Sequence, residues 1–215
     1  MSKTSTPHQT VQRVGTESAD EVISKDGTRI AFSQWGHGSS PLVLVDGALG
    51  HRSFGPMPKL APLLACDFTV VAYDRRGRGD SGDTAPYSVE RELDDLEAVI
   101  DAVGGSACVV GVSSGAALAL EAANRLSSVE KLGVYEAPFI VDGSRPPLTN
   151  EWLAELDRLV AADRRGDAVK LFMKFVGTPS LFVAVMRWTP VWSKLRAVAH
   201  TLPYDLAHQG GHGHW

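Results

Sequence analysis

Residues 107–126 read ACVVGVSSGAALALEAANRL, which is an apolar run, a Gly-x-Ser-x-Gly turn and an alanine-rich segment. The pattern predicts a strand that ends in a sharp turn at Ser113 and continues into a helix. Gly111 and Gly115 fit this turn because a side chain at either position would collide with the neighbouring strand or helix. Backbone N–H groups at a helix N-terminus can stabilise a developing oxyanion, so Ser113 is a candidate nucleophile. The alternative is an ordinary Gly/Ser turn.

Two more buried strands are predicted upstream, at residues 42–45 (LVLV) and 68–73 (FTVVAY). Short, wholly apolar runs are typical of parallel strands that are covered on both faces. Strands alternating with helices predict a doubly wound α/β sheet, whose ligands bind at the carboxyl ends of the strands. Ala48, Asp74, Ser113 and Glu136 all fall at such ends, which predicts an active site at this edge.

The strand at 42–45, the strand at 68–73 and the Gly-x-Ser-x-Gly turn follow one another in the order found in the α/β-hydrolase family. The chain resembles this family over residues 20–205. The turn DRRGRGDS after the second strand matches the family's Asp-x-Arg-Gly-x-Gly-x-Ser-like turn at Asp74, Arg76, Gly77, Gly79 and Ser81. The resemblance implies that Ser113 is the nucleophile and that the backbone N–H groups of Ala48 and Ser114 form the oxyanion hole. It also implies a mechanism without a cofactor.

Asp46 departs from the family pattern, because the family most often has histidine at this position. A carboxylate near a developing negative charge is unfavourable unless it points away or is paired. Arg52 and Arg75 are the candidate partners.

We predict four segments: a tail at 1–19, an α/β-hydrolase core at 20–140, a helical lid at 141–205 and an atypical Gly/His tail at 206–215. In the core, Asp26-Gly27 predicts a hairpin between strands at 20–25 and 29–35. Helices are expected at 54–65 and 88–103, and a further strand at 131–136. The acidic face of the second helix, which includes Asp94, Asp95 and Glu97, is expected to be solvated.

The lid segment shows three helical patterns across 149–200 and is rich in large apolar residues. Such a lid favours a substrate with an apolar portion, such as an ester, lactone or amide. The alternative is that these side chains only pack the lid onto the core. They are Trp152, Leu153, Leu159, Leu171, Phe172, Phe175, Phe182, Met186, Trp188 and Trp192.

A serine nucleophile needs a histidine base that a carboxylate orients, and in the family these follow the last two strands. No apolar run after the lid predicts such strands, so both triad positions are expected to be absent. Glu136 and the histidines at 200, 208, 212 and 214 are weak substitutes, and His212 with His214 is too little for a specific metal site. We expect either a truncated reading frame or a non-catalytic descendant, with self-association through an exposed sheet edge as a consequence.

The composition indicates one soluble domain: 215 residues, 44% hydrophobic, with a formal net charge of −4. The net charge argues against a nucleic-acid partner or an anionic membrane surface. No apolar segment reaches the length of a membrane span, and the polar N-terminus lacks a secretory signal, so a cytoplasmic setting is expected. Cys66 and Cys108 are expected to be small buried residues.

The leading functional hypothesis is a serine hydrolase that acts on an ester-like or related carbonyl small molecule with an apolar portion. The alternative is a catalytically impaired pseudo-hydrolase that serves as a small-molecule binding or interaction module.

Overall fold

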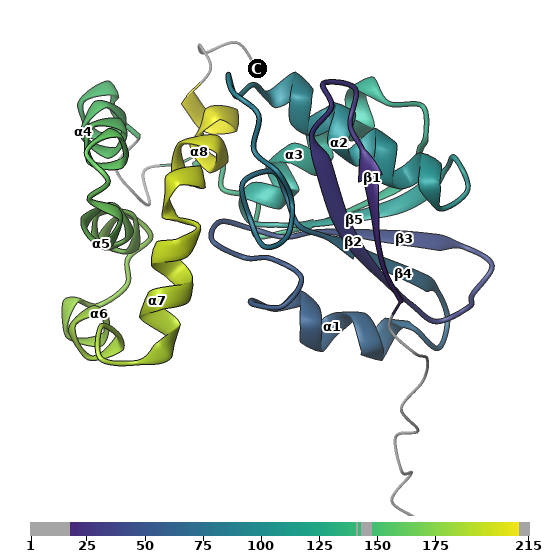
Figure 1. The fold of residues 1–215 in the computed structure, drawn as a ribbon, viewed down its shortest axis with the longest axis horizontal. Coiled ribbons are helices and arrows are strands. Elements are labelled where there is room, and N and C mark those ends of the chain that lie inside the picture. The colour runs from purple at the N-terminus through teal and green to yellow at the C-terminus, as the bar shows by residue number, and fades with distance from the viewer. Residues whose placement is uncertain (1–17, 141, 143–147, 211–215) are drawn as a thin grey trace, which may run out of the picture.

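A six-stranded mixed sheet forms the core of the computed structural model, which describes residues 18–140, 142 and 148–210 (Figure 1). The strand order is β1-β2-β4-β3-β5-β6, with β1–β2 and β2–β4 antiparallel and the remaining pairs parallel. The predicted doubly wound, mostly parallel α/β fold is therefore confirmed. The strands are β1 (Ser18–Ile23), β2 (Arg29–Trp35), β3 (Pro41–Val45), β4 (Thr69–Tyr73), β5 (Ala107–Val112) and β6 (Val129–Tyr135).

The alternation of side chains along β3 divides the core into two layers. Val43 and Val45 face one cluster, which helices α2 (Val89–Ala102) and α3 (Ser114–Arg125) cover. Leu42 and Leu44 face the other cluster, which α1 (Met57–Leu64) covers. Because both faces are covered, β3 is apolar throughout, as expected for a buried parallel strand.

Two expectations about burial are wrong. Asp95 on α2 is buried, because Arg76 reaches it from the turn after β4 and forms two hydrogen bonds of 2.8 and 2.7 Å. Cys66 is exposed, because it lies in the turn that follows α1, and Cys108 is only partly buried.

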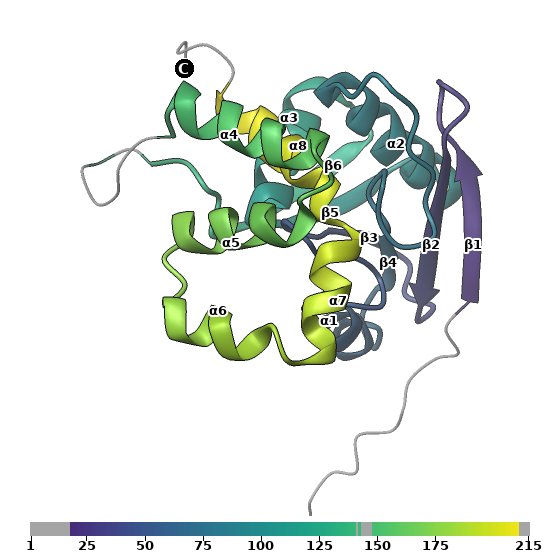
Figure 2. The same cartoon turned by 60° about the vertical axis from the view of Figure 1, so that its left-hand side comes forward.

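The lid segment is helical and packs as a separate layer beside the sheet (Figure 2). The pattern predicts three helices between 149 and 200, with breaks at Gly166, at 177–179 and at Pro190, and the structure has four. The breaks at 177–179 and before Pro190 are confirmed, whereas Gly166 lies inside the helix at 165–175. The last helix continues through residues 206–210, into the segment described above as an atypical tail. Residues 1–17 and 211–215 of the predicted tails lie outside the described residues. The lid elements are α4 (Asn150–Ala161), α5 (Arg165–Phe175), α6 (Ser180–Met186), α7 (Pro190–Ala197), a 3-10 turn (Ala199–Thr201) and α8 (Leu202–Gly210).

Among the described residues, no helix has the length and apolar composition that a bilayer crossing needs.

Strand β6 is the last strand of the described sheet, and its outer edge pairs with no other described strand. Val134 and Tyr135 near its end are 50% and 61% exposed. An unpaired edge with exposed apolar side chains is a template for pairing with another chain.

We predict that the chain self-associates through this edge and that Val134→Lys shifts it toward the monomer, because an edge lysine opposes pairing. Sedimentation velocity over a wide concentration range measures the shift. Leu63→Lys on α1, also at an exposed apolar position, is the matched control and should leave the association unchanged. A wild-type chain that is monomeric throughout would contradict the prediction.

Candidate active site

Ser113 lies between β5 and α3 with φ 54° and ψ −123°, a conformation that residues with a side chain rarely adopt. Its backbone N–H donates a hydrogen bond of 2.9 Å to the carbonyl oxygen of Tyr135, which fixes the turn against β6. A Cβ on Gly111 would lie 2.6 Å from the Cα of Ala116, and one on Gly115 would lie 2.6 Å from the carbonyl oxygen of Asp46. Both glycines are therefore required by close approach, as the motif predicts.

The loop after β3 runs directly against the serine. A Cβ on Gly47 would lie 3.1 Å from the Cβ of Ser113, so a larger residue would require the loop or the serine to shift slightly. Ala48 and Ser114 line the same cavity as Ser113. Within the described part of the chain, the backbone N–H groups of Ala48 and Ser114 donate to no other group. They are thus available for an anionic oxygen.

Asp46 is buried but forms no ion pair with either predicted partner. Its Oδ1 accepts a hydrogen bond of 2.8 Å from the N–H of Gly47, and its Oδ2 has no partner among the described residues. Arg52 instead binds the carboxylates of Asp74 and Asp80. Arg75 reaches only the backbone carbonyl of Asp46, at 3.4 Å.

The expectation that Arg52 or Arg75 pairs with the Asp46 carboxylate is therefore wrong. Burial raises the pKa of Asp46 to about 6, although the hydrogen bond from Gly47 and the nearby cations Arg78 and Arg75 lower it.

Asp205 on α8 is the site residue that the sequence pattern missed. Its Oδ1 accepts three hydrogen bonds: from Ser114 Oγ at 2.7 Å, from Arg75 at 2.8 Å and from Arg78 at 2.6 Å. The side chain is fully buried and lines the cavity beside Ser113. The signal in the sequence is the absence of Asp and Glu from residues 168–204, which makes Asp205 the first carboxylate after that stretch.

The arginines of the turn after β4 connect this carboxylate to the rest of the site. Arg75 forms two hydrogen bonds of 2.7 and 2.6 Å with Glu92 on α2. Arg78 donates to the carbonyl oxygen of Gly47 at 2.8 Å and to Thr201 Oγ1 at 3.0 Å. The same cluster therefore contacts the loop after β3, helix α3 and the lid.

Asp74 has a structural role in this turn and does not line the cavity. It accepts hydrogen bonds from the backbone N–H of Arg52 at 2.7 Å and of Asp80 at 2.9 Å.

The cavity between sheet and lid has a volume of about 490 Å³. Its polar part consists of Ser113, Ser114, Asp205 and Glu136. Glu136 lies at the rim, directly after the end of β6, and has a φ of 51°. Half of the cavity's apolar residues come from the lid, and the others follow β3 and β6. They are Phe172, Phe175, Val176 and Leu206 from the lid, and Ala48, Ala137, Pro138 and Ile140 from the other segments. Of the other lid aromatics, Trp152 and Trp192 pack within the lid, in keeping with the packing alternative, whereas Phe182 and Trp188 are exposed. Phe172 and Phe175 line the cavity.

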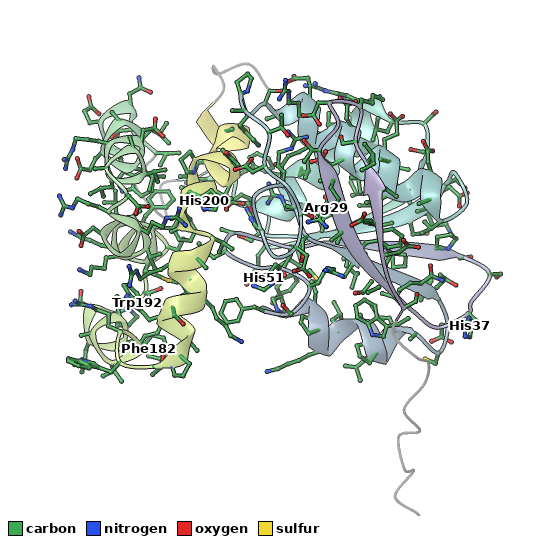
Figure 3. The ribbon with its side chains drawn as sticks, viewed as in Figure 1. Arg29, His37, His51, Phe182, Trp192 and His200 are labelled. Carbon is green, nitrogen blue, oxygen red and sulfur yellow. The ribbon has the colours of Figure 1, made fainter. Side chains whose placement is uncertain are left out.

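No histidine whose side chain is described lines the cavity. His51 Nδ1 lies 3.1 Å from Ser53 Oγ, and His200 Nε2 lies 3.7 Å from the Asp83 carboxylate. Burial lowers the pKa of both imidazoles. Figure 3 shows them on the sheet and lid sides of the boundary, with His37 at the far end of the sheet. His8, His212 and His214, and the side chain of His208, lie outside the described residues.

The sequence of residues 35–214 matches the model of the alpha/beta hydrolase family. The chain belongs to this family. A solved alpha/beta hydrolase from Sphaerobacter thermophilus is 54% identical, with a TM-score of 0.82 over 89% of this chain and 74% of that chain.

Two relatives with named activities are more distant. The N-formylmaleamic acid deformylase of Pseudomonas putida S16 is 27% identical, with a TM-score of 0.58 over 90% of this chain and 73% of its own. The RutD protein of Enterobacter cloacae subsp. cloacae, named as a carbamate hydrolase, is 37% identical over 89 residues, or 40% of this chain. The match spans 33% of that protein, so the chain aligns with about a third of this curated relative's length.

Asp46→Asn tests the electrostatics of the loop. The folded-state pKa of about 6 exceeds the ordinary value of 3.8, so the folded state holds a proton that the unfolded state loses. Stability therefore falls as pH rises from about 4 to 6. We predict that Asp46→Asn, which cannot titrate, gains on the order of 1 kcal/mol relative to wild type between pH 5 and pH 7. Urea unfolding at both pH values measures this, and a constant difference would contradict it.

Asp205→Ala tests the ion cluster. Removing this carboxylate leaves Arg75 and Arg78 buried with one partner fewer, so we expect a loss of about 3 kcal/mol or more in the free energy of unfolding. Glu155→Ala, which breaks an exposed pair with Arg158 on α4, is the control and should cost less than about 1 kcal/mol. Equal losses in urea unfolding would show that the cluster carries no special energy.

Proposed function

We propose that this cavity is a serine hydrolase site for an ester-like or related carbonyl small molecule with an apolar portion. The observation that carries the proposal is the strained turn at Ser113, which shares one cavity with the unpaired N–H groups of Ala48 and Ser114. The apolar lid side chains Phe172 and Phe175 favour an apolar acyl or leaving group. The name of the Enterobacter relative adds carbamates to the candidate substrates.

In the proposed reaction, Ser113 Oγ adds to the substrate carbonyl carbon, and the carbonyl oxygen becomes an oxyanion. The N–H groups of Ala48 and Ser114 hold that oxygen, so they bind the transition state more strongly than the substrate. Collapse of the tetrahedral intermediate expels the leaving group with a proton and leaves an acyl-serine. Water then attacks the acyl group and releases the acid and Ser113.

The serine proton must pass to a base, and this step separates the two candidate functions. The family resemblance implies histidine, but no described imidazole lines the cavity. This observation favours the second candidate, a pseudo-hydrolase that binds small molecules with little turnover. Of the two carboxylates in the cavity lining, Asp205 is paired with Arg75 and Arg78, so Glu136 at the rim is the candidate substitute.

We expect this chain to hydrolyse p-nitrophenyl butyrate slowly, without a titration near pH ~6–7, because no described imidazole lines the cavity and a serine without its histidine base loses several powers of ten in rate. Ser113→Ala should then change the rate little. A fluorophosphonate should label the protein slowly but only at Ser113, which peptide mass spectrometry locates. Ser193→Ala, at an exposed serine of α7, is the control.

An adduct at another serine, or no adduct, would contradict the proposed site. Fast turnover that requires Ser113 and is lost on changing Glu136, His200, His208, His212 or His214 would support the hydrolase and overturn the pseudo-hydrolase. Slow, Ser113-independent turnover with an adduct at Ser113 would support a binding module that retains the site.

A further inference from the structure

The outer end of the lid carries an apolar surface that neither the fold nor the cavity uses. We call it the lid-tip patch, and its exposed fractions are high: Leu181 78%, Phe182 60%, Val185 60%, Trp188 93% and Val191 39%. Leu181, Val185 and Trp188 follow helical spacing and share one face of α6 and its continuation. Val183 on the opposite face is buried in the lid cluster.

The patch faces away from the sheet. Figure 2 shows α6 and the turn into α7 at the end of the lid farthest from β1 and β2. Figure 3 places Phe182 at this outer end, below Trp192. No residue of the patch lines the catalytic cavity, so binding of a substrate at Ser113 does not explain its exposure.

The charge of this part of the chain is opposite to that of the whole. Residues 168–204 contain no Asp or Glu, although the chain has a formal net charge of −4. The cations of this stretch are Lys170, Lys174, Arg187, Lys194 and Arg196. The net charge of the chain is therefore the sum of an acidic core and a basic lid. The negative net charge argued above against an anionic membrane surface, but that argument does not apply to the lid.

A hollow of about 250 Å³ concentrates some of these cations beside the patch. Five cationic side chains line it with two carboxylates, Asp163 and Asp167, which pair with Arg164, Arg165 and Lys170. Arg187 and Arg196 complete the hollow and form no ion pair with any described residue. Arg187 is the sequence neighbour of Trp188, which is 93% exposed, so a cation without a described ion pair belongs to the same turn as the patch.

We propose that the lid-tip patch, together with Arg187 and Arg196, docks the protein on an anionic phospholipid surface. Aliphatic side chains and a tryptophan can enter the headgroup boundary, while arginines bind phosphates at the same level. A second copy fits less well, because a two-fold contact through this patch would bring identical cations together. A free anion would leave the apolar side chains in water.

The test is co-sedimentation with sucrose-loaded vesicles of phosphatidylcholine and phosphatidylglycerol in equal parts. We expect binding to these vesicles, little binding to pure phosphatidylcholine, and weakening by salt. Leu181→Ser with Val185→Ser, and separately Arg187→Glu with Arg196→Glu, should each weaken binding by about tenfold or more. All four side chains are exposed, so the variants should retain the wild-type circular dichroism and melting temperature.

Matched controls lie away from the lid. Ile23→Ser with Leu63→Ser removes two apolar side chains of similar exposure, 62% and 65%. Lys59→Glu with Lys131→Glu makes the same change in charge at exposed positions. Both controls should bind like wild type. Ser113→Ala should also bind like wild type, so failure of the proposed function and failure of this proposal are distinguishable.

Trp188 supplies a second readout, a blue shift of its fluorescence on vesicles that Trp188→Phe removes. Equal vesicle binding by wild type and either lid variant would overturn the proposal. So would a lipid-free dimer that the lid variants dissociate, because a second copy would then cover the patch. Binding of inorganic phosphate at Arg187 and Arg196 without any vesicle binding would reduce the site to an anion hollow and overturn it as well.

Discussion

The buried ion cluster around Arg75 and Arg78 is the constraint on which the other parts of the site depend. Desolvating an ion costs several kcal/mol, and only well-placed partners recover that cost. Arg75 meets Glu92 through two hydrogen bonds and Asp205 through a third, and Arg78 meets the same Asp205 oxygen. The arrangement is stable only when the turn after β4, helix α2 and helix α8 are all in place. It therefore couples the position of the lid to that of the core.

This coupling extends to both arms of the proposed oxyanion hole. Arg78 holds the carbonyl oxygens of Gly47 and Gly50, which flank Ala48, and Asp205 holds the hydroxyl of Ser114. A catalytic hole works when its donors are fixed before the reaction, so that no reorganisation is needed as charge develops. In the proposed site, the ion pairs of Arg75, Arg78 and Asp205 would supply that rigidity.

The sequence predicted the features that local chemistry determines. Gly111 and Gly115 are required by contacts within one strand–turn–helix unit, so their spacing alone located Ser113. Asp205 lies 130 positions from Arg75, and no motif connects them, so only the fold reveals the pair. Asp95 was misplaced for the same reason: helical periodicity put it on a solvated face, and a distant arginine buries it. The unpartnered Asp46 could not be predicted either, because its environment depends on how the loop folds over it.

The arginines of the chain therefore serve two purposes that composition cannot separate. Arg75 and Arg76 are buried, and carboxylates on α2 and α8 neutralise them, so they contribute geometry and little external field. Arg187 and Arg196 are exposed and have no described carboxylate partner, so their field extends into solvent beside an apolar patch. A net charge of −4 is the sum over both groups. Long-range attraction to a charged partner depends on Arg187 and Arg196, because only uncompensated surface charges act beyond contact distance.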